Sequence, residues 1–306
     1  MKVFLISHIA DLDGVMPVIL TDLVFEEYDY KLLEIVDVDN FMNESLDNNL
    51  FDSYDKVFMT DLNISKEVAD RIDNSDFKNK FQVLDHHIGS IEMNKYSFDK
   101  VVDEANGMKE SGTSLYYKYL LVNYPNDLLN KESVKYMVNL VRLGDTWEWK
   151  KYNIPEARDL STILYYYGND MFIDNYKVFL RENKEFYFNK IETTLLTVDK
   201  NKKEDYIENM KDKITIKEIN NMKVGIVFAE NYRSELGNEL CEYYKDTIDA
   251  LMIINLNRTL SFRSVKDNAD VNKLASKFGG GGHLHAAGAP LKDNIREILI
   301  DKYLEI

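Results

Sequence analysis

The first half of the chain alternates short apolar runs with longer helical patterns. Residues 2–6 form an apolar run, residues 15–25 follow with a helical period, and residues 32–38 are apolar again. This order is typical of βαβ units, in which parallel strands are joined by helices that cover the sheet. Apolar runs at residues 56–60 and 81–84 predict two further strands. The pattern therefore predicts an α/β fold with a mostly parallel sheet.

Helical patterns dominate the middle of the chain. Residues 109–123 and 131–143 are amphipathic, and residues 155–196 continue in helical period with many tyrosines. Residues 199–212 are strongly charged and have no apolar period, so we expect them to connect two domains. This interpretation gives a first domain, with a helical connector, at residues 1–198.

The last third of the chain returns to short strands. Apolar runs that predict strands lie at residues 224–229, 250–255 and 260–265, and a helical pattern lies at residues 234–244. A glycine run follows at residues 279–282. We therefore expect a second, smaller domain of mixed α/β type at residues 213–306.

The overall charge restricts the partners of the protein. The 306 residues include 53 acids and 38 bases, which gives a net charge of -15. Such a surface repels polyanions at long range, so we expect no long nucleic-acid track. A short anionic substrate remains compatible with this charge, because carboxylates that bind cations also contribute to it.

A single cysteine and a short apolar start predict a cytoplasmic location. Cys241 cannot form an intramolecular disulfide or a zinc–cysteine cluster, which fits a reducing compartment. Its surroundings predict a helix face, where we expect it to pack in the core. The apolar start meets Asp11 almost at once, so it is too short for a signal peptide or a membrane span. We expect no membrane partner.

All five histidines of the chain fall in three polar clusters. His8 stands in SHIADLDG, His86 and His87 stand in LDHH, and His283 and His285 stand in GGGGHLHAAG. One histidine alone is more often structural than functional. Their joint placement, with aspartates beside the first three, favours a functional site.

The first two clusters follow predicted strands of the parallel sheet, and Asp61 follows another. Ligands bind beyond the carboxyl ends of such strands, so these side chains are expected to meet. Hard divalent cations prefer oxygen ligands, and a minority of imidazoles favours Mn²⁺ over Mg²⁺. Four carboxylates would balance two divalent cations. The six candidate metal ligands are His8, Asp11, Asp13, Asp61, His86 and Asp145.

The start of the predicted helix at residues 109–123 allows two interpretations. Ser111, Gly112 and Thr113 precede its apolar part, so free backbone N–H groups there could receive an anion. The same residues are also typical of a simple helix cap. Both interpretations stay open from the sequence.

These motifs together resemble the DHH phosphoesterases, a family named for the triplet that stands here as Asp85-His86-His87. Phe262-Arg263-Ser264 and the stretch GGGHLHAAG at residues 280–288 are similar to the DHH-associated domain of that family. The resemblance covers residues 3–289. The first motif, spaced H-x-x-D-x-D-G, is most similar to nanoRNase B-like members, whose spacing is H-x-D-x-D-G, and pyrophosphatase-like members have H-x-x-x-D-x-D.

The resemblance implies a role for each matching residue. It makes the six candidate ligands a two-metal site that Asp61 bridges, with His87 on the scissile phosphate and Asp85 orienting the imidazoles. Arg263 and His283 would bind an anionic group of the substrate from the second domain. Gly280, Gly281 and Gly282 would let the backbone approach a phosphate, since glycine has no Cβ. The active site would lie in the cleft between the domains.

Aromatic residues near Asp145 have two interpretations. Trp147 and Trp149 could stack on nucleobases, but packing anchors are the more common role of such residues. We therefore favour packing for both tryptophans. We also expect residues 165–167, which are three tyrosines, to belong to a helix interface.

The sequence thus predicts a phosphoesterase of the DHH type. Its substrates would be short oligonucleotides or linear or cyclic dinucleotides, and the chain would be a monomer or a homodimer. The alternatives are a phosphatase of 3′-phosphoadenosine 5′-phosphate and a pyrophosphatase or polyphosphatase, which could use the same metals. A nucleotide-binding protein without hydrolysis is an alternative from another class.

Overall fold

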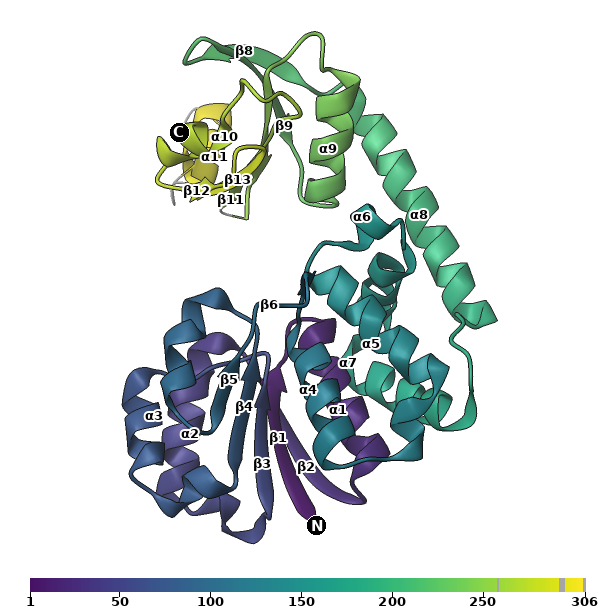
Figure 1. Cartoon of the computed structure of the whole chain (residues 1–306). Helices are drawn as coiled ribbons and strands as arrows, with labels where there is room; N and C mark the ends of the chain where they lie inside the picture. The colour runs from purple at the N-terminus through teal and green to yellow at the C-terminus, as the bar shows by residue number, and fades with distance from the viewer. Residues whose placement is uncertain (258, 292–294, 305–306) are drawn as a thin grey trace. The chain divides into compact units, whose positions relative to one another are not determined.

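The computed structural model describes residues 1–257, 259–291 and 295–304. The chain forms two compact units, Met1–Leu196 and Thr197–Ile306 (Figure 1). The roles assigned to the two predicted domains, and the cleft between them, stay predictions.

The first unit is built on a five-stranded parallel sheet, which confirms the predicted fold class. Its strands are β1 (Lys2–His8), β2 (Glu27–Leu33), β3 (Lys56–Thr60), β4 (Phe81–Asp85) and β5 (Asp99–Val101). The order across the sheet is β2-β1-β3-β4-β5, and all four pairings are parallel. The chain therefore reverses its direction of winding between β1 and β3.

The prediction of a strand at residues 32–38 was wrong in its position. The strand β2 ends at Leu33, and Ile35 and Val36 lie in a short 3₁₀ turn with 63% and 83% of their surface exposed. The strand is at the edge of the sheet and its outer residues are polar, so it carries no apolar run that the sequence could reveal.

Helices cover both faces of this sheet (Figure 1). One face carries α1 (Leu12–Val24), α4 (Gly112–Asn123), α5 (Glu132–Asp145) and α7 (Glu156–Glu182), and the other carries α2 (Val38–Asp47) and α3 (Lys66–Asp73). The side chains of β1 alternate between the two cores, with Leu5 on one side and Phe4 on the other. The smaller elements are α6 (Trp149–Tyr152), β6 (Glu104–Ala105) and β7 (Met108–Lys109).

The long helix α7 is interrupted at Gly168, whose φ is 69°. The next residue, Asn169, donates from Nδ2 to the carbonyl oxygen of Ile9 at 2.9 Å. The kink therefore ties α7 to the loop that follows β1. The predicted helix interface of three tyrosines was wrong for Tyr165, which is 81% exposed, whereas Tyr167 packs partly against the core.

The charged segment that we expected to connect two domains lies almost entirely in a helix. Helix α8 runs without a break over Lys190–Lys211. Ile207 and Met210 are buried, and Tyr206 packs beside them in the core of the second unit. These three apolar side chains lie close together and pack the helix against the core. They are too few to give the sequence of this charged helix a visible apolar periodicity.

The second unit contains a mixed sheet of six strands, which confirms the predicted mixed α/β type. Its order is β12-β13-β11-β10-β9-β8, and only the pairing of β9 with β10 is parallel. The buried Cys241 packs in this unit, as predicted. The elements are β8 (Thr215–Ile219), β9 (Met222–Phe228), α9 (Arg233–Tyr243), β10 (Ala250–Asn255), β11 (Thr259–Arg263), α10 (Val271–Ser276), β12 (Gly281–Gly282), β13 (Ala286–Pro290) and α11 (Ile295–Leu304).

The helices of both units differ from membrane spans. Over residues 1–257, 259–291 and 295–304, no helix combines the length and the apolar character needed to cross a bilayer.

Candidate metal centre

The candidate site lies at the carboxyl ends of three neighbouring strands. His8 is the last residue of β1, Asp61 follows β3, and Asp85 is the last residue of β4. Beneath them, the buried hydroxyl of Thr60 donates to Ser7 Oγ at 2.8 Å and so joins β1 to β3. The site therefore occupies the point where the winding of the sheet reverses, which is where ligands bind in open α/β sheets.

A first group of ligand atoms gathers around His8. Its Nδ1 lies 3.4 Å from Asp11 Oδ2 and 3.4 Å from Asp61 Oδ2. Asp11 also caps α1, because its Oδ1 accepts from the N–H of Gly14 at 3.1 Å. Two ligands about 2.1 Å from one octahedral cation are about 3 Å apart, so these spacings fit a shared ion.

A second group gathers around the other ring, that of His86. Its Nε2 lies 3.2 Å from Asp61 Oδ1, 3.5 Å from Asp145 Oδ2 and 3.6 Å from Asp13 Oδ2. Asp61 thus presents one carboxylate oxygen to each group. The fold brings together all six side chains that the sequence named as ligands, in sets that could each hold a metal ion. Their binding of metal stays a prediction.

Two glycines allow the backbone segments that carry the candidate ligands to lie this close together. A Cβ on Gly14 would stand 1.9 Å from the carbonyl oxygen of His8, and a Cβ on Gly112 would stand 2.7 Å from the backbone nitrogen of Asp61. Asp61 itself has a φ of 56° and is 3% exposed. A buried aspartate in the left-handed region is strained, and such strain is typical of functional sites.

The start of α4 receives the carboxylate of Asp13. The N–H of Gly112 donates to Asp13 Oδ2 at 2.6 Å, and the N–H of Thr113 donates to Oδ1 at 2.9 Å. Ser111 caps the same helix through the N–H of Ser114. Both interpretations of this segment therefore hold in part, since the helix is capped and its free N–H groups also bind a carboxyl group of the chain itself.

The titration of these groups reflects their proximity. Hydrogen bonds to Asp11 and Asp61 raise the pKa of His8 to about 10. Burial opposes the charge of His86, but its contacts with Asp61, Asp13 and Asp145 prevail and raise its pKa to about 9. Burial also raises the pKa of Asp145 to about 6. Without metal, the positive charges of the His8 and His86 imidazoles offset the repulsion between the neighbouring carboxylates.

His87 is paired with Asp85 and also lies near Asp61 and His86, with which it forms a third possible ligand set. Its Nδ1 lies 2.7 Å from Asp85 Oδ1, and half of its side chain is exposed. The hydrogen bond to Asp85 raises the pKa of His87. Burial opposes ionisation of Asp85, but hydrogen bonds from His87 and Asn63 prevail and lower its pKa. The pair therefore offers a solvent-facing imidazole, whose protonated form Asp85 favours, beside the ligand groups.

Comparison with curated proteins gives relatives that are longer than this chain. No protein-family model matches it. It is 32% identical to oligoribonuclease NrnB of Bacillus subtilis over 234 residues, which cover 74% of this chain and 57% of that protein. It is 25% identical over 226 residues to an uncharacterised protein of Acanthamoeba polyphaga mimivirus, with 69% and 47% covered. The chain thus spans about half the length of these relatives.

Solved structures match nearly the whole chain. A DHH domain described as a member of a family of ribosomal proteins has a TM-score of 0.57 at 13% identity, covering 99% of this chain and 86% of that one. The chain is thus similar in sequence to oligoribonuclease NrnB and has the fold of a DHH domain. The pGpG-specific phosphodiesterase PggH of Vibrio cholerae has a TM-score of 0.50 at 11% identity, with 99% and 97% covered. The family resemblance of the sequence motifs is thereby confirmed.

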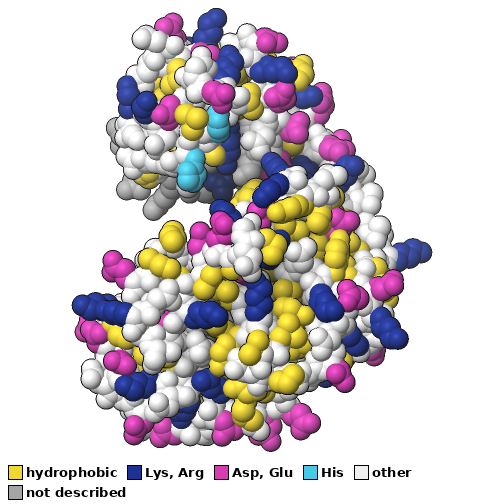
Figure 2. Space-filling view, viewed as in Figure 1, with side chains coloured by type: hydrophobic (Ala, Val, Ile, Leu, Met, Phe, Trp, Pro, Cys, Tyr) yellow, Lys and Arg dark blue, Asp and Glu magenta, His cyan; other side chains and the backbone are white. Residues whose placement is uncertain are grey.

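The second unit of the chain holds the other predicted site residues. Arg263 is half-buried and donates to the carbonyl oxygen of Phe262 and to Ser234 Oγ. His283 and His285 are exposed, and Figure 2 shows histidine side chains at the surface of this unit. His285 Nε2 lies 3.4 Å from Asp267 Oδ1. Binding of substrate by these residues stays a prediction.

The glycine run has a structural role that the sequence did not reveal. A Cβ on Gly280 would stand 2.0 Å from the carbonyl oxygen of Gly288, and a Cβ on Gly282 would stand 2.6 Å from that of Ala286. Close packing of the run against β13 therefore requires glycine at both positions. The exposed Gly281 lies between them, and a Cβ there would meet only Asn272 Oδ1, at 3.6 Å.

Sequence reasoning missed several residues that position the candidate site. Asn63 Nδ2 donates to Asp85 Oδ2 at 3.2 Å and to Asp99 Oδ1 at 3.3 Å. Asn169 holds the loop after β1, and Gly112 supports both Asp13 and Asp61. The Gly-Asn pair at residues 168–169 was a turn signal inside a helical pattern, and it could have drawn attention to that contact.

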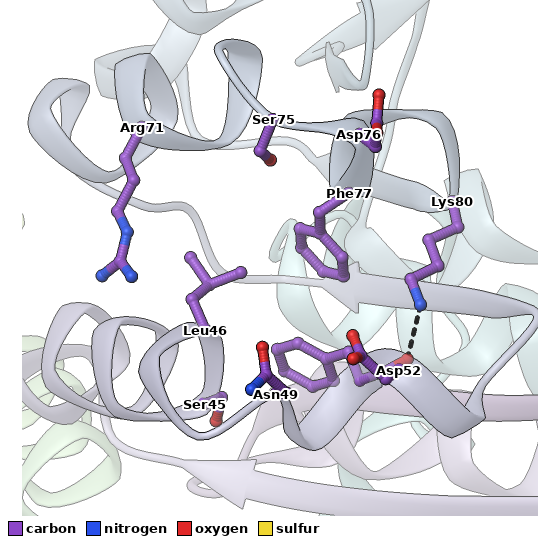
Figure 3. Close-up of a pocket in the computed structure, with 10 residues that line it drawn as sticks. Ser45, Leu46, Asn49, Asp52, Arg71, Ser75, Asp76, Phe77 and Lys80 are labelled. Atoms are coloured by element: carbon purple, nitrogen blue, oxygen red, sulfur yellow. Dashed lines mark hydrogen bonds between the residues drawn. The ribbon is translucent and has the colours of Figure 1, made fainter.

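A separate cavity of about 470 Å³ lies among α2, α3 and the 3₁₀ turns beside them (Figure 3). Phe51 and Phe77 stack at its base with ring centroids 5.1 Å apart. Arg71 is paired with Asp47, and Lys80 donates to the carbonyl oxygen of Phe51. Because both cations are already paired, the cavity presents little chemistry for an anion.

Proposed function

We propose that the chain is a divalent-cation-dependent phosphoesterase that hydrolyses short oligonucleotides or dinucleotides. The observation that carries this proposal is the placement of Asp61 between two ligand groups. Its Oδ2 lies 3.4 Å from His8 Nδ1, and its Oδ1 lies 3.2 Å from His86 Nε2. A carboxylate that faces two neighbouring groups supports a bridged pair of cations.

The donor set supports hard divalent cations, with Mn²⁺ preferred and Mg²⁺ possible. Two such cations, when bound, lower the pKa of water and stabilise both oxygens of an in-line displacement at phosphorus. Asp11, Asp13, Asp61 and Asp145 supply four negative charges, which would balance two divalent ions. The imidazoles of His8 and His86 complete the groups. A neutral site can then accept a phosphate anion without a large electrostatic cost.

The chain's own residues divide the remaining work. His87 is held by Asp85 and faces solvent, so it can stabilise negative charge on the scissile phosphate. Asp85 fixes the ring through Nδ1, because its Oδ1 also accepts the backbone N–H groups of His86 and His87. Arg263, His283 and the Gly280–Gly282 run would bind a distal anionic group of the substrate.

Relatives and charge support a short substrate. One relative is named an oligoribonuclease and one structural neighbour is described as specific for pGpG. The net charge of -15 disfavours long polyanions, whereas a dinucleotide carries few charges. We propose a cytoplasmic location, which fits the single buried cysteine.

A panel of substrates tests this proposal. Purified protein with Mn²⁺ is offered a 5′-phosphorylated dinucleotide, a 20-mer, a cyclic dinucleotide, 3′-phosphoadenosine 5′-phosphate and pyrophosphate. We expect the dinucleotides to be hydrolysed fastest and chelator to stop the reaction. Preference for either of the last two substrates would favour a phosphatase or pyrophosphatase, and binding without hydrolysis would favour a nucleotide-binding protein.

A matched pair of variants connects the activity to the bridging carboxylate. Asp61→Asn removes the charge that both ligand groups share, so we expect turnover to be lost. Asp52→Asn changes an exposed aspartate of the separate cavity and serves as the control. Wild-type rates in Asp61→Asn, or full activity in chelator, would contradict the two-cation site.

A further inference from the structure

Trp147 combines exposure with a strained backbone. It lies two residues beyond Asp145, and 66% of its surface is exposed. Its φ is 59°, in the left-handed region that bulky side chains rarely adopt. An exposed tryptophan contributes little to the core, so packing of its side chain does not explain the strain. Trp147 directly follows the C-cap of α5, Thr146, where helices often end in this conformation, but usually with glycine or asparagine rather than a bulky residue.

The backbone on both sides of Trp147 is tied to one buried arginine. The hydroxyl of Thr146 donates to the carbonyl oxygen of Arg142 at 2.7 Å, and Arg142 Nη1 lies 2.8 Å from Glu148 Oε2. Arg142 is 9% exposed and also donates to the carbonyl oxygen of Lys109. The indole is therefore presented from a segment that is held in place.

The neighbouring tryptophan behaves differently. Trp149 is partly buried against the core of the first unit, and the guanidinium of Arg158 lies 5.6 Å from the centre of its ring. Our sequence-based preference for packing thus holds for Trp149. It was wrong for Trp147, whose ring is mostly exposed.

We propose that Trp147 is a stacking platform for a nucleobase of the substrate, an inference that rests on the proposed function. Trp147 is two residues from Asp145 along the chain, and two residues span at most about 7 Å. The backbone that carries the indole therefore lies within about the length of one nucleotide from the Asp145 backbone. A phosphate at the ligand groups would therefore place its base within reach of the ring. Stacking on indole accepts any base, because every base has a π-face. The residue confers preference for nucleotides over other phosphoesters without selecting a sequence.

The test compares a base-bearing substrate with one that lacks bases. The substrates are a 5′-phosphorylated diadenosine dinucleotide and the same dinucleotide with abasic sugars, both with Mn²⁺. Trp147→Asn removes the ring but keeps a residue that tolerates positive φ, and Trp147→Phe keeps an aromatic face. Tyr187→Ala removes another exposed aromatic residue and serves as the control.

We expect the ratio of kcat/KM for the base-bearing over the abasic substrate to fall about five- to hundredfold in Trp147→Asn. Most of the fall should lie in KM. Trp147→Phe should retain most of the ratio, and Tyr187→Ala should retain all of it. An unchanged ratio in Trp147→Asn, or equal losses on both substrates, would overturn the stacking role. Failure of the wild-type protein to hydrolyse either substrate would instead overturn the proposed function.

Discussion

Gly112 lies so close to Asp61 that a Cβ on the glycine would stand 2.6 Å from the Cβ of the aspartate. This approach joins the start of α4 to the residue after β3. The N–H of Gly112 donates to Asp13, so one glycine positions two of the candidate ligands. The candidate site therefore depends on a residue that has no side chain able to bind metal or substrate.

Gly112→Ala should weaken metal binding strongly. The added methyl group cannot fit against Asp61, so either the aspartate or α4 must move. We expect Mn²⁺ affinity, measured by titration calorimetry, to fall about ten- to hundredfold, as for other groups that orient metal ligands. Gly89→Ala is the control, since a Cβ there would meet open space. Equal affinities of the two variants would contradict this role.

Metal should stabilise the folded protein through the Asp61 bridge. A ligand present at a hundred times its Kd adds about 2.7 kcal/mol to the free energy of unfolding. We expect Mn²⁺ to raise the Tm of the wild type and chelator to reverse the change. Asp61→Asn should lose most of this gain. A similar gain in that variant would show that Mn²⁺ stabilises the chain elsewhere.

Asp99 should make stability depend on pH. Burial, and then the charge of Asp85, raise the pKa of Asp99 to about 7, and its Oδ2 has no hydrogen-bond partner among the described residues. A raised pKa means that the folded state binds more protons than the unfolded state. Its stabilising effect is complete below about pH 4, the unfolded pKa, and is lost as pH rises through about 7.

Asp99→Asn removes this titration. Relative to wild type, the variant should therefore gain stability between pH 5 and pH 8, on the order of 1 to 3 kcal/mol. Urea unfolding in chelator at the two pH values measures the difference. Parallel pH profiles of the two proteins would show that Asp99 titrates normally.

Arg263 and Asp145 should differ in which substrates they affect. Asp145→Ala removes a group that lies 3.5 Å from His86, so every substrate should suffer. Arg263→Ala should mainly impair substrates with a second anionic group, by roughly ten- to hundredfold in kcat/KM. Bis(p-nitrophenyl) phosphate and a 5′-phosphorylated dinucleotide are the paired substrates. Equal losses on both in Arg263→Ala, with the fold intact by circular dichroism, would contradict selection by this residue.

The sequence predicted the parts of the fold that leave a local pattern. Buried strands such as β3 and β4 show as apolar runs, and the polar residues after them mark the site. The position of the edge strand β2 was misjudged, and helix α8 left no apolar period, because few of their residues are buried. Apolar periodicity reports burial, so an element with little burial leaves little signal.

The sequence revealed the candidate ligands that the fold brings together, but not the residues that support them. Aspartates and histidines beside strand ends are visible in the sequence because their chemistry is specific. Asn63, Gly112 and Asn169 act through contacts with distant segments, such as the 2.9 Å bond from Asn169 to Ile9. Only the folded chain brings such pairs together. The exposure of Trp147, in contrast to Trp149, is likewise a property of tertiary structure.

The wide separation of the ligands along the chain has a consequence during synthesis. His8 leaves the ribosome early, and Asp145 follows on the order of ten seconds later at roughly 5 to 20 residues per second. Until then the nascent chain would hold only a partial set of the candidate ligands, which we expect to compete poorly for metal in the cell. The α5 segment that ends in Asp145 closes the set. Metal uptake would therefore begin only after α5 is made, while the rest of the first unit, up to Leu196, is still to follow.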